Sequence, residues 1–215
     1  QCIKQVLEPI CEAKFYKHSY GFRPNRSAHH AVARAMFLVN ISKYRFVVDV
    51  DIKGFFDNVN HGKLLKQLWT LGIRDKQLLC ILSKMLKAPI QGEGVPAKGV
   101  PQGGILSPLL SNVVLNELDW WISSQWGTFP TKTNYAHDLS RYQNLRRTSR
   151  MKEVFIVRYA DDFKLFCKSR SDAERLFTAT TMWLKERLAL EISPEKSKIV
   201  NLKKGYSDFL GFKLK

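Results

Sequence analysis

The sequence predicts an α+β fold, and three observations lead to this prediction. Residues 45–52, RFVVDVDI, form a short valine-rich run bounded by Gly54, which is typical of a strand. Residues 109–122 carry apolar side chains at helical spacing, directly after the turn-rich segment 99–108. Residues 154–168 contain two apolar runs around a short polar step, which indicates a hairpin. The chain of 215 residues is long enough to enclose a sizeable core.

The remaining elements follow from local patterns along the chain. Residues 61–73 predict a helix that ends at Gly72. Residues 127–152 are polar, aromatic and basic without a clean period, so we expect a loop or insertion there. Ser171 and Glu174 predict a capping box at the start of another helix. The inner face of that helix is expected to hold Ala173, Leu176, Phe177, Thr180, Leu184 and Leu188.

The charge of the chain is strongly basic and unevenly distributed. There are 35 Lys and Arg residues against 19 Asp and Glu, which gives a formal net charge of +16. Residues 13–48 contain basic residues and no acid, and residues 140–152 contain five basic residues and no acid. The segment 196–215 holds six lysines and one aspartate. A polyanionic partner is therefore expected, and nucleic acid is favoured over an anionic membrane because no strong amphipathic helix or lipidation motif is present.

Neither membrane insertion nor secretion is indicated. No apolar run approaches the length of about 18 residues that a membrane span needs, and the first residues lack the basic head and apolar block of a signal peptide. The four cysteines are Cys2, Cys11, Cys80 and Cys167, without a CxxC pair or a His at zinc-ligand spacing. We therefore expect a cytoplasmic protein with reduced thiols.

Two adjacent carboxylates occupy the turn of the predicted hairpin. Asp161 and Asp162 would project into one small volume and repel each other. A hard divalent cation with oxygen ligands is the usual way to relieve such repulsion. A third ligand is expected from the other predicted strand, where Asp49 and Asp51 lie on the same face. Three such carboxylates can hold two Mg²⁺ ions about 3.5–4 Å apart, an arrangement that drives in-line phosphoryl transfer.

Four segments occur together in a characteristic order. They are DIKGFFD at 51–57, GVPQGGILSP at 99–108, YADD at 159–162 and LGF at 210–212. In this combination the sequence resembles the reverse transcriptase family, and specifically its group II intron-encoded type. Residues 20–32, YGFRPNRSAHHAV, and residues 190–201, LEISPEKSKIVN, resemble the neighbouring fingers and palm segments. The resemblance implies a polymerase-type palm, with an antiparallel sheet backed by helices, and a partial, mostly helical fingers lobe.

The resemblance also implies how the chain is divided. Residues 1–46 would be a partial fingers lobe, and residues 47–73 would hold the first catalytic strand and helix of the palm. Residues 74–106 would connect fingers and palm, and residues 107–215 would complete the palm with a basic insertion at about 127–152. The helical thumb, or maturase region, and the basic fingers residues that clamp a triphosphate are expected to lie outside the chain.

The resemblance assigns the metal site to particular residues. Asp51, Asp161 and Asp162 match the metal-binding triad, and the backbone carbonyl of Ile52 would be a further ligand. The cofactor implied is a pair of Mg²⁺ ions, with Mn²⁺ as a substitute. Asp51 is preferred to Asp49 because the ring five residues after it, Phe56, then matches the gate that excludes a ribose 2′-hydroxyl. The alternative for that ring is a core phenylalanine.

Other residues match nucleotide or nucleic-acid contacts of the family. Gln102, Gly103 and Gly104 resemble the segment that lines the nascent base pair, and glycine lets backbone approach a nucleotide closely. Lys196 resembles the lysine proposed to protonate the leaving pyrophosphate, with an ordinary solvated lysine as the alternative. Basic side chains expected to contact RNA are Arg23, Arg26, Arg146, Arg147 and Arg150.

The function implied is the RNA-directed DNA polymerase core of a group II intron-encoded protein, which also binds intron RNA. Its partners would be an RNA template, intron RNA, a DNA or RNA primer and dNTPs, without a membrane, and homodimer formation stays open. One alternative is an RNA-binding maturase module whose polymerase site is secondary or idle. Another is a two-metal nuclease, which needs neither Phe56 nor the PQGG segment.

Overall fold

The fold is α+β, as the sequence predicts. The computed structural model describes residues 1–90, 92 and 94–215, so that residues 91 and 93 of the predicted connection 74–106 lie outside the described part. The helices in this part are α1 (Cys2–Glu12), α2 (Ala28–Met36), α3 (Phe55–Asn58), α4 (His61–Thr70), α5 (Lys76–Leu86), α6 (Ser107–Ser124), α7 (Asp138–Thr148) and α8 (Arg170–Trp183). Two π-helical turns, η1 (Phe37–Ile41) and η2 (Leu184–Leu188), extend α2 and α8.

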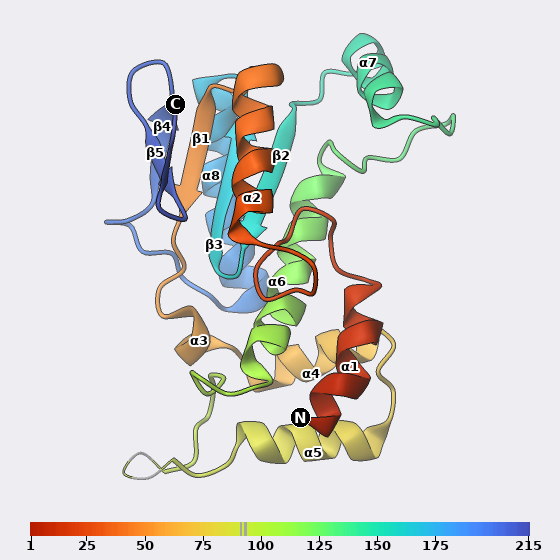
Figure 1. Ribbon diagram of the computed structural model, residues 1–215, viewed down its shortest axis with the longest axis vertical. Helices are drawn as coiled ribbons and strands as arrows, with labels where there is room; N and C mark the ends of the chain where they lie inside the picture. The colour runs from red at the N-terminus through yellow and green to blue at the C-terminus, as the bar shows by residue number, and fades with distance from the viewer. Residues whose placement is uncertain (91, 93) are drawn as a thin grey trace.

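A four-stranded antiparallel sheet forms the centre of the upper half of the molecule (Figure 1). The strands are β1 (Phe46–Val50), β2 (Val154–Tyr159), β3 (Asp162–Cys167) and β4 (Lys198–Asn201), in the order β2-β3-β1-β4. A separate hairpin consists of β5 (Ser207–Phe209) and β6 (Phe212–Leu214). The predicted strand at 45–52 and the predicted hairpin at 154–168 are both confirmed.

The two faces of the sheet are covered by different elements. On the front face Asp49 lies opposite Lys164, and this face is covered by α2 and the β5–β6 hairpin. Ser207 of β5 donates a hydrogen bond to Asp49, and Arg34 of α2 lies over the ring of Phe155 in β2. On the back face, α8 and α6 pack against the strands (Figure 1). The alternation of side chains along each strand thus places Asp49 and Lys164 on the front face and Arg158 on the back face, towards α6.

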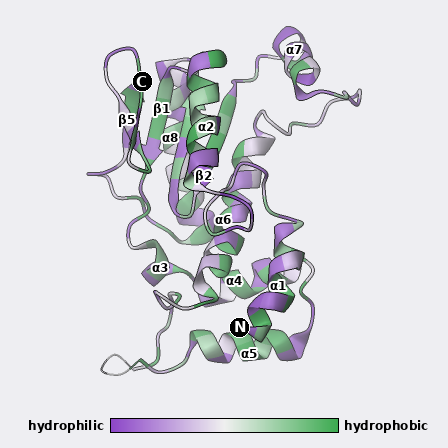
Figure 2. Ribbon diagram, in the orientation of Figure 1, coloured by the Kyte–Doolittle hydropathy of each residue, from purple (hydrophilic) through white to green (hydrophobic). Residues whose placement is uncertain are grey.

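Helix α6 is the central element that joins the sheet to the lower helices. Thirteen of its 18 residues are buried, because β2, α1 and α4 all pack around it. A helix that is buried on most sides needs apolar or internally bonded side chains throughout. Figure 2 shows the strands and the inward faces of the helices as mainly hydrophobic. The predicted helix at 109–122 is confirmed and begins two residues earlier.

Two local expectations are wrong. Residues 127–152 are not only a loop, because α7 forms within them; its only buried residue is Leu145, so it has no apolar stripe to reveal it. Asp138 in its first turn and arginines in its last turn complement the helix dipole instead. The cap of α8 is Ser169 rather than Ser171, since the Ser169 side chain accepts from the backbone N–H of Asp172 at 3.2 Å. The helix accordingly begins at Arg170.

No described helix has both the length and the apolar character that a membrane span requires.

Candidate active site

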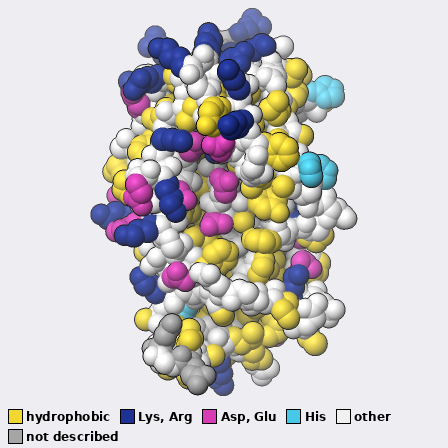
Figure 3. All heavy atoms as spheres, turned by 60° about the vertical axis from the view of Figure 1, so that its left-hand side comes forward, with side chains coloured by type: hydrophobic (Ala, Val, Ile, Leu, Met, Phe, Trp, Pro, Cys, Tyr) yellow, Lys and Arg dark blue, Asp and Glu magenta, His cyan; other side chains and the backbone are white. Residues whose placement is uncertain are grey.

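Acidic residues from three parts of the chain line one pocket of about 230 Å³, which we call the carboxylate pocket. Its lining residues are Asp49, Val50, Asp51, Ile52, Asp161, Asp162, Lys164, Lys196, Lys198 and Asp208. In Figure 3, Asp and Glu side chains gather near the middle of one face of the molecule, and Lys and Arg side chains border them. The structure therefore brings together the residues predicted as metal ligands, with Lys196 beside them.

The loop after β1 is held in place by its backbone. The N–H of Asp51 donates to the hydroxyl of Ser197 at 3.1 Å, and the carbonyl of Asp51 accepts from the N–H of Ser193 at 2.8 Å. Two residues later in the chain, the N–H of Lys53 donates to the carbonyl of Glu191 at 2.9 Å. These bonds use main-chain groups of residue 51 and leave its carboxylate available to the pocket.

Asp49 and Asp51 have different surroundings. The carboxylate of Asp49 accepts from the ammonium of Lys164 at 2.8 Å and from the hydroxyl of Ser207 at 2.8 and 3.0 Å. Among the described residues, no hydrogen bond or ion pair engages the carboxylates of Asp51, Asp161 or Asp162. A metal needs lone pairs that are not already shared. The geometry thus favours Asp51 over Asp49 as a ligand.

The electrostatics of the pocket favour a cation. Burial raises the pKa of Asp162 from 3.8 to about 6. Lys164 opposes this rise, whereas Asp49, Asp161 and Asp51 add to it by repulsion. Burial and like charges both disfavour the ionised carboxylate, and a bound cation would reverse both effects.

The donor set fits a hard divalent ion. Carboxylate and carbonyl oxygens suit Mg²⁺ or Mn²⁺, whereas zinc sites usually contain His or Cys. Within the described ranges, no three His, Cys, Asp or Glu side chains are already grouped closely enough to hold a metal. The carboxylates share a pocket but would have to turn towards one another to bind an ion.

A fully buried arginine supports the turn that carries Asp161. The guanidinium of Arg158 donates to both carboxylate oxygens of Asp119 at 2.6–3.0 Å, and it is 0% exposed. It also donates to the side-chain oxygen of Asn112 at 2.9 Å and to the carbonyl of Ala160 at 2.7 Å. Ala160 has a φ of 57°, a left-handed conformation that is unfavourable for alanine. Because Arg158 is itself bonded to Asp119 and Asn112 of α6, its bond to the Ala160 carbonyl connects the left-handed turn to that helix.

Glycine is required where the N-terminal segment meets this turn. A Cβ atom at Gly21 would lie 2.2 Å from the backbone nitrogen of Ala160, which no side chain could tolerate. The carbonyl of Gly21 accepts from the side-chain amide of Asn112 at 2.8 Å. The turn is thus held by backbone on one side and by α6 on the other.

The structure also brings Phe56 close to the PQGG segment. The N–H of Val100 donates to the carbonyl of Phe56 at 2.7 Å, and the amide of Gln102 donates to Asp57 at 3.3 Å. Phe56 is half-buried and meets Phe55 edge to face at 5.3 Å. Gly103 has a φ of 78° with open space around its Cβ position, so its backbone conformation is what selects glycine there. Neither Phe56 nor Gln102 lines the carboxylate pocket itself.

The arginines predicted to bind RNA fall into two groups. Arg23 is buried, with three hydrogen bonds to the carboxylate of Glu12 and two to the backbone carbonyls of Tyr16 and Ser19. Its donors are therefore consumed inside the protein, and we correct its expected role to a structural one. Arg26 is half-buried and donates to backbone carbonyls.

The basic segment around α7 contains one paired and two solvent-facing arginines. Arg146 forms a two-point ion pair with Glu153 at 3.0 and 2.7 Å, whereas Arg147 and Arg150 are exposed. Burial raises the pKa of Glu153, but hydrogen bonds from Arg146, Lys168 and Tyr44 outweigh it and lower the pKa to about 2. Of these three arginines, Arg147 and Arg150 keep their full charge available to a ligand.

Sequence reasoning missed several residues that build the site. Arg158 interrupts the apolar run VFIVRY, and Asp119 interrupts the apolar helix α6; two opposite charges in buried segments were a signal of pairing. Lys164 and Ser207, which occupy the Asp49 carboxylate, gave no signal in the sequence because they are 43 residues apart and meet only through tertiary packing.

An antiparallel sheet with carboxylates at the β2–β3 turn and after β1, backed by helices, defines a palm-type polymerase domain. The chain belongs to the reverse transcriptase family, since the family model described as "Reverse transcriptase (RNA-dependent DNA polymerase)" matches residues 1–214. Enzymes of this family generally use divalent metal ions.

Curated relatives carry the same domain within longer chains. Protein YkfC of Escherichia coli (strain K12) is 33% identical over 222 residues, which cover 97% of this chain and 58% of YkfC. The group II intron-encoded protein LtrA of Lactococcus lactis subsp. cremoris is 31% identical over 255 residues, which cover 100% of this chain and 42% of LtrA. The chain thus spans about half the length of these relatives.

Solved structures share the fold at low identity. A telomerase from Candida albicans, solved in complex with the TWJ fragment of telomeric RNA, matches with a TM-score of 0.64 and 14% identity over 99% of this chain and 36% of that chain. An apo telomerase from Candida tropicalis matches with a TM-score of 0.63 and 12% identity, over 99% of this chain and 39% of that chain. These matches confirm the predicted polymerase-type palm.

Proposed function

We propose that this chain is the catalytic core of an RNA-directed DNA polymerase of the group II intron-encoded type. The observation that carries the proposal is that Asp51, Asp161 and Asp162 line one pocket, with carboxylates that no described residue engages. The relatives support the type, because LtrA is a group II intron-encoded protein and shares the whole length of this chain.

The residues of the pocket would divide the work of nucleotidyl transfer. When bound, two divalent ions, Mg²⁺ or Mn²⁺, supply charge that favours ionisation of a primer 3′-hydroxyl and stabilises departing pyrophosphate. Asp51, Asp161, Asp162 and the carbonyl of Ile52 would hold these ions. The bond that forms would join the primer 3′-oxygen, whose proton passes to solvent, to the α-phosphorus of a dNTP. The bond between the α-phosphorus and the oxygen that bridges to the β-phosphorus would break, so that pyrophosphate leaves. The ammonium of Lys196 would donate a proton to the pyrophosphate.

The proposed substrates rest on residues outside the lining of the carboxylate pocket. Phe56 would exclude a ribose 2′-hydroxyl, and Gln102 and Gly103 would line the nascent base pair. The partners proposed are an RNA template, a DNA or RNA primer, dNTPs and intron RNA. Arg26, Arg146, Arg147 and Arg150 remain candidate RNA contacts. We propose a cytoplasmic location, and homodimer formation stays open.

The proposed division into lobes is kept as predicted: fingers at 1–46, palm at 47–73 and 107–215, and their connection at 74–106. Within the first of these ranges, α2 packs directly on β2 and thus on the front face of the palm sheet. If the fingers moved relative to the palm, α2 would therefore have to move with the palm, although it belongs to the range 1–46.

Primer extension on an RNA template, with and without Mg²⁺, tests the proposed function. We expect metal-dependent extension with dNTPs and no cleavage of an end-labelled strand. Cleavage without extension would instead identify a two-metal nuclease. RNA binding with no extension under any metal condition would favour the maturase alternative, in which the polymerase site is idle.

A further inference from the structure

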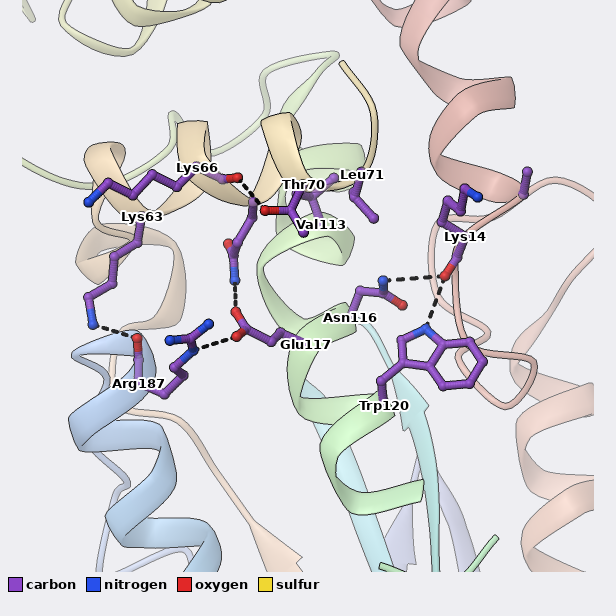
Figure 4. Close-up of a pocket in the computed structure, with 12 residues that line it drawn as sticks. Lys14, Lys63, Lys66, Thr70, Leu71, Val113, Asn116, Glu117, Trp120 and Arg187 are labelled. Carbon is purple, nitrogen blue, oxygen red and sulfur yellow. Dashed lines mark hydrogen bonds and ion pairs between the residues drawn. The ribbon is translucent and has the colours of Figure 1, made fainter. Parts of the chain in front are cut away.

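A second hollow, which we call the basic groove, lies between the segment that follows α1 and the elements α4, α6 and η2 (Figure 4). Its volume is about 620 Å³, and it shares no lining residue with the carboxylate pocket. The charged residues that line it are Lys14, Lys63, Lys66, Arg187 and Glu117. Four cations thus face one acid in a space large enough for a small ligand or a nucleotide.

The cations of the groove are only partly used by the protein. Lys63 is anchored, since its ammonium donates to the backbone carbonyls of Glu186 and Arg187 at the end of η2. Glu117 accepts from the guanidinium of Arg187 and, at 2.8 Å, from the side-chain amide of Gln67. Lys14 and Lys66 are exposed, so their charges are open to a ligand.

Lys14 and Lys66 have no acidic partner among the described residues. Figure 4 shows them on opposite sides of the groove, with Glu117 and Asn116 of α6 between them. Two separate ammonium groups across one hollow attract a ligand that carries more than one negative charge. Successive phosphates of a nucleic-acid strand meet this requirement.

The indole of Trp120 forms a fixed aromatic wall beside Lys14. Its N–H donates to the carbonyl of Lys14 at 3.0 Å, and its ring meets that of Tyr16 edge to face at 5.5 Å. The side chain is nevertheless 44% exposed. A large aromatic ring that is held rigidly yet open to solvent, among cations, is the combination on which unpaired bases stack.

We propose that the basic groove binds an unpaired segment of RNA outside the carboxylate pocket. One base would stack on Trp120, and the neighbouring phosphates would meet Lys14, Lys66 and the exposed side of Arg187. An RNA duplex hides its base faces inside the helix and could not use the indole. This inference goes beyond the proposed function, because it assigns RNA binding to a groove that contains none of the candidate RNA contacts named there, Arg26, Arg146, Arg147 and Arg150.

The experiment measures RNA binding while the catalytic site is already occupied. The protein is first saturated with an RNA–DNA template–primer whose primer ends in a dideoxynucleotide, and a short labelled single-stranded RNA is then titrated by fluorescence anisotropy at several salt concentrations. We expect the loaded protein to bind this second RNA. In Lys14→Gln/Lys66→Gln, affinity should fall about tenfold, and the salt slope should decrease by about 0.7 for each phosphate that is no longer neutralised.

Matched control variants distinguish the loss of specific contacts in the basic groove from the loss of overall positive charge. Lys76→Gln/Lys84→Gln removes the same charge from α5, outside the groove, and should change affinity less than twofold. Trp120→Phe retains a ring and should keep most of the affinity, whereas Trp120→Leu should lose it; circular dichroism checks that both variants fold. Quenching of tryptophan emission by the RNA should be present in wild type and reduced in Trp120→Phe.

Three outcomes would overturn the proposal. They are the absence of second-RNA binding to the loaded protein, an equal effect of groove and α5 variants, and equal affinity for the same RNA as a duplex. Extension of a pre-annealed template–primer by the groove variants is measured in parallel and should match wild type. Loss of extension in wild type would reject the proposed function, yet it would leave the binding result for the groove intact.

Discussion

Arg158 and Asp161 lie three residues apart on one hairpin, but their charges have opposite surroundings. Arg158 is buried and bonded to Asp119, Asn112 and the carbonyl of Ala160. Asp161 shares the carboxylate pocket with other acids, and no described residue pairs with it. The buried charge of Arg158 is tolerated because its hydrogen-bond partners neutralise it. The half-buried charge of Asp161 lies among other carboxylates and has no such partner. Several carboxylates close together without a cation indicate that the β2–β3 turn is the functional part of the hairpin.

The position of Asp161 also depends on Arg158. The carbonyl of Ala160 belongs to the residue directly before Asp161, and it is bonded to Arg158 at 2.7 Å. Ala160 itself adopts a left-handed conformation, which the surrounding contacts must maintain. The Arg158–Asp119 pair therefore fixes the backbone that carries the unpaired carboxylates of Asp161 and Asp162. Substitutions on either side should consequently have different effects, on catalysis at one end and on stability at the other.

The largest effect is expected from neutralising the pocket. Asp161→Asn or Asp51→Asn should reduce primer extension at least about 10,000-fold, or about 5.5 kcal/mol, because an amide is a poor ligand for a divalent ion. RNA affinity should stay within twofold, since these side chains meet metal rather than phosphate. Single-turnover extension and filter binding measure the two quantities.

Asp138→Asn is the matched control for this loss, because Asp138 pairs with Lys17 and Arg141 and does not line the carboxylate pocket. It should extend primers as wild type does. Equal loss of binding and extension in a folded Asp161→Asn protein would reject the metal role.

Removing one member of the Arg158–Asp119 pair should instead affect stability. Asp119→Ala leaves the guanidinium of Arg158 buried without its carboxylate, which costs about 3–5 kcal/mol of unfolding free energy. Denaturant unfolding measures it. The double variant Asp119→Leu/Arg158→Met should recover much of this loss, because apolar groups of similar size can replace a buried pair.

A surface pair supplies the contrast. Arg170 and Glu174 are more than half exposed and lie one helical turn apart in α8, so Glu174→Ala should cost less than about 0.5 kcal/mol. An equally small cost for Asp119→Ala would show that the buried pair is not what holds the hairpin.

Asp162 provides a pH-dependent test of the pocket. Its pKa is raised from 3.8 to about 6 in the folded protein. Between these values the folded state binds more protons than the unfolded state, so unfolding free energy decreases as pH rises from about 4 to about 6. Asp162→Asn does not titrate and should be more stable than wild type at pH 8, by about 3 kcal/mol.

The measurement is denaturant unfolding of both proteins in EDTA across this pH range. The difference between them should disappear below about pH 4, where the carboxyl is protonated in both the folded and the unfolded state. A difference that is constant with pH would mean that neither burial nor repulsion raises the pKa of Asp162 in the folded protein. Added Mg²⁺ should stabilise wild type more than the variant.

Phe56 tests whether the ring next to the PQGG segment faces a nucleotide. A ribose hydroxyl against a rigid ring is buried without a partner, at a cost of about 1–3 kcal/mol. Phe56→Val should therefore lower the preference for dCTP over CTP at least about tenfold. The ratio of single-nucleotide incorporation efficiencies opposite a template guanine measures it, and Phe55→Leu, a change at the buried neighbour, is the control. An unchanged ratio would make Phe56 a core residue.

The sequence predicted the elements whose signal is local. The strand at 45–52 and the hairpin at 154–168 follow from apolar runs. Four residues of the carboxylate pocket, Asp51, Asp161, Asp162 and Lys196, follow from the motifs that contain them, whereas Lys164 and Asp208 do not. Helix α7 was missed because only Leu145 and Tyr142 pack against the core, which is too few apolar positions to give a clear helical period. Arg23 was taken for a surface cation because its acidic partner, Glu12, lies eleven residues earlier and meets it only after the chain turns back.

The smallest effect is expected at the surface, where paired and free arginines lie side by side. Arg147→Ala/Arg150→Ala should weaken binding to RNAs of unrelated sequence about equally. It should also lower the slope of log K against log salt by roughly 0.7–0.9 for each phosphate that is no longer neutralised. Arg146→Ala should change the slope less, because its guanidinium already neutralises Glu153 at 2.7 Å. Equilibrium binding at four or more salt concentrations measures each slope. If Arg146 contributed as much as Arg147 and Arg150, an ion pair with a carboxylate would not prevent a surface arginine from binding RNA. The contrast between the paired Arg158 and the unpaired Asp161 would then apply only to the interior of the protein. If none of the three changed the slope, α7 would be a solvated helix and the RNA would bind elsewhere.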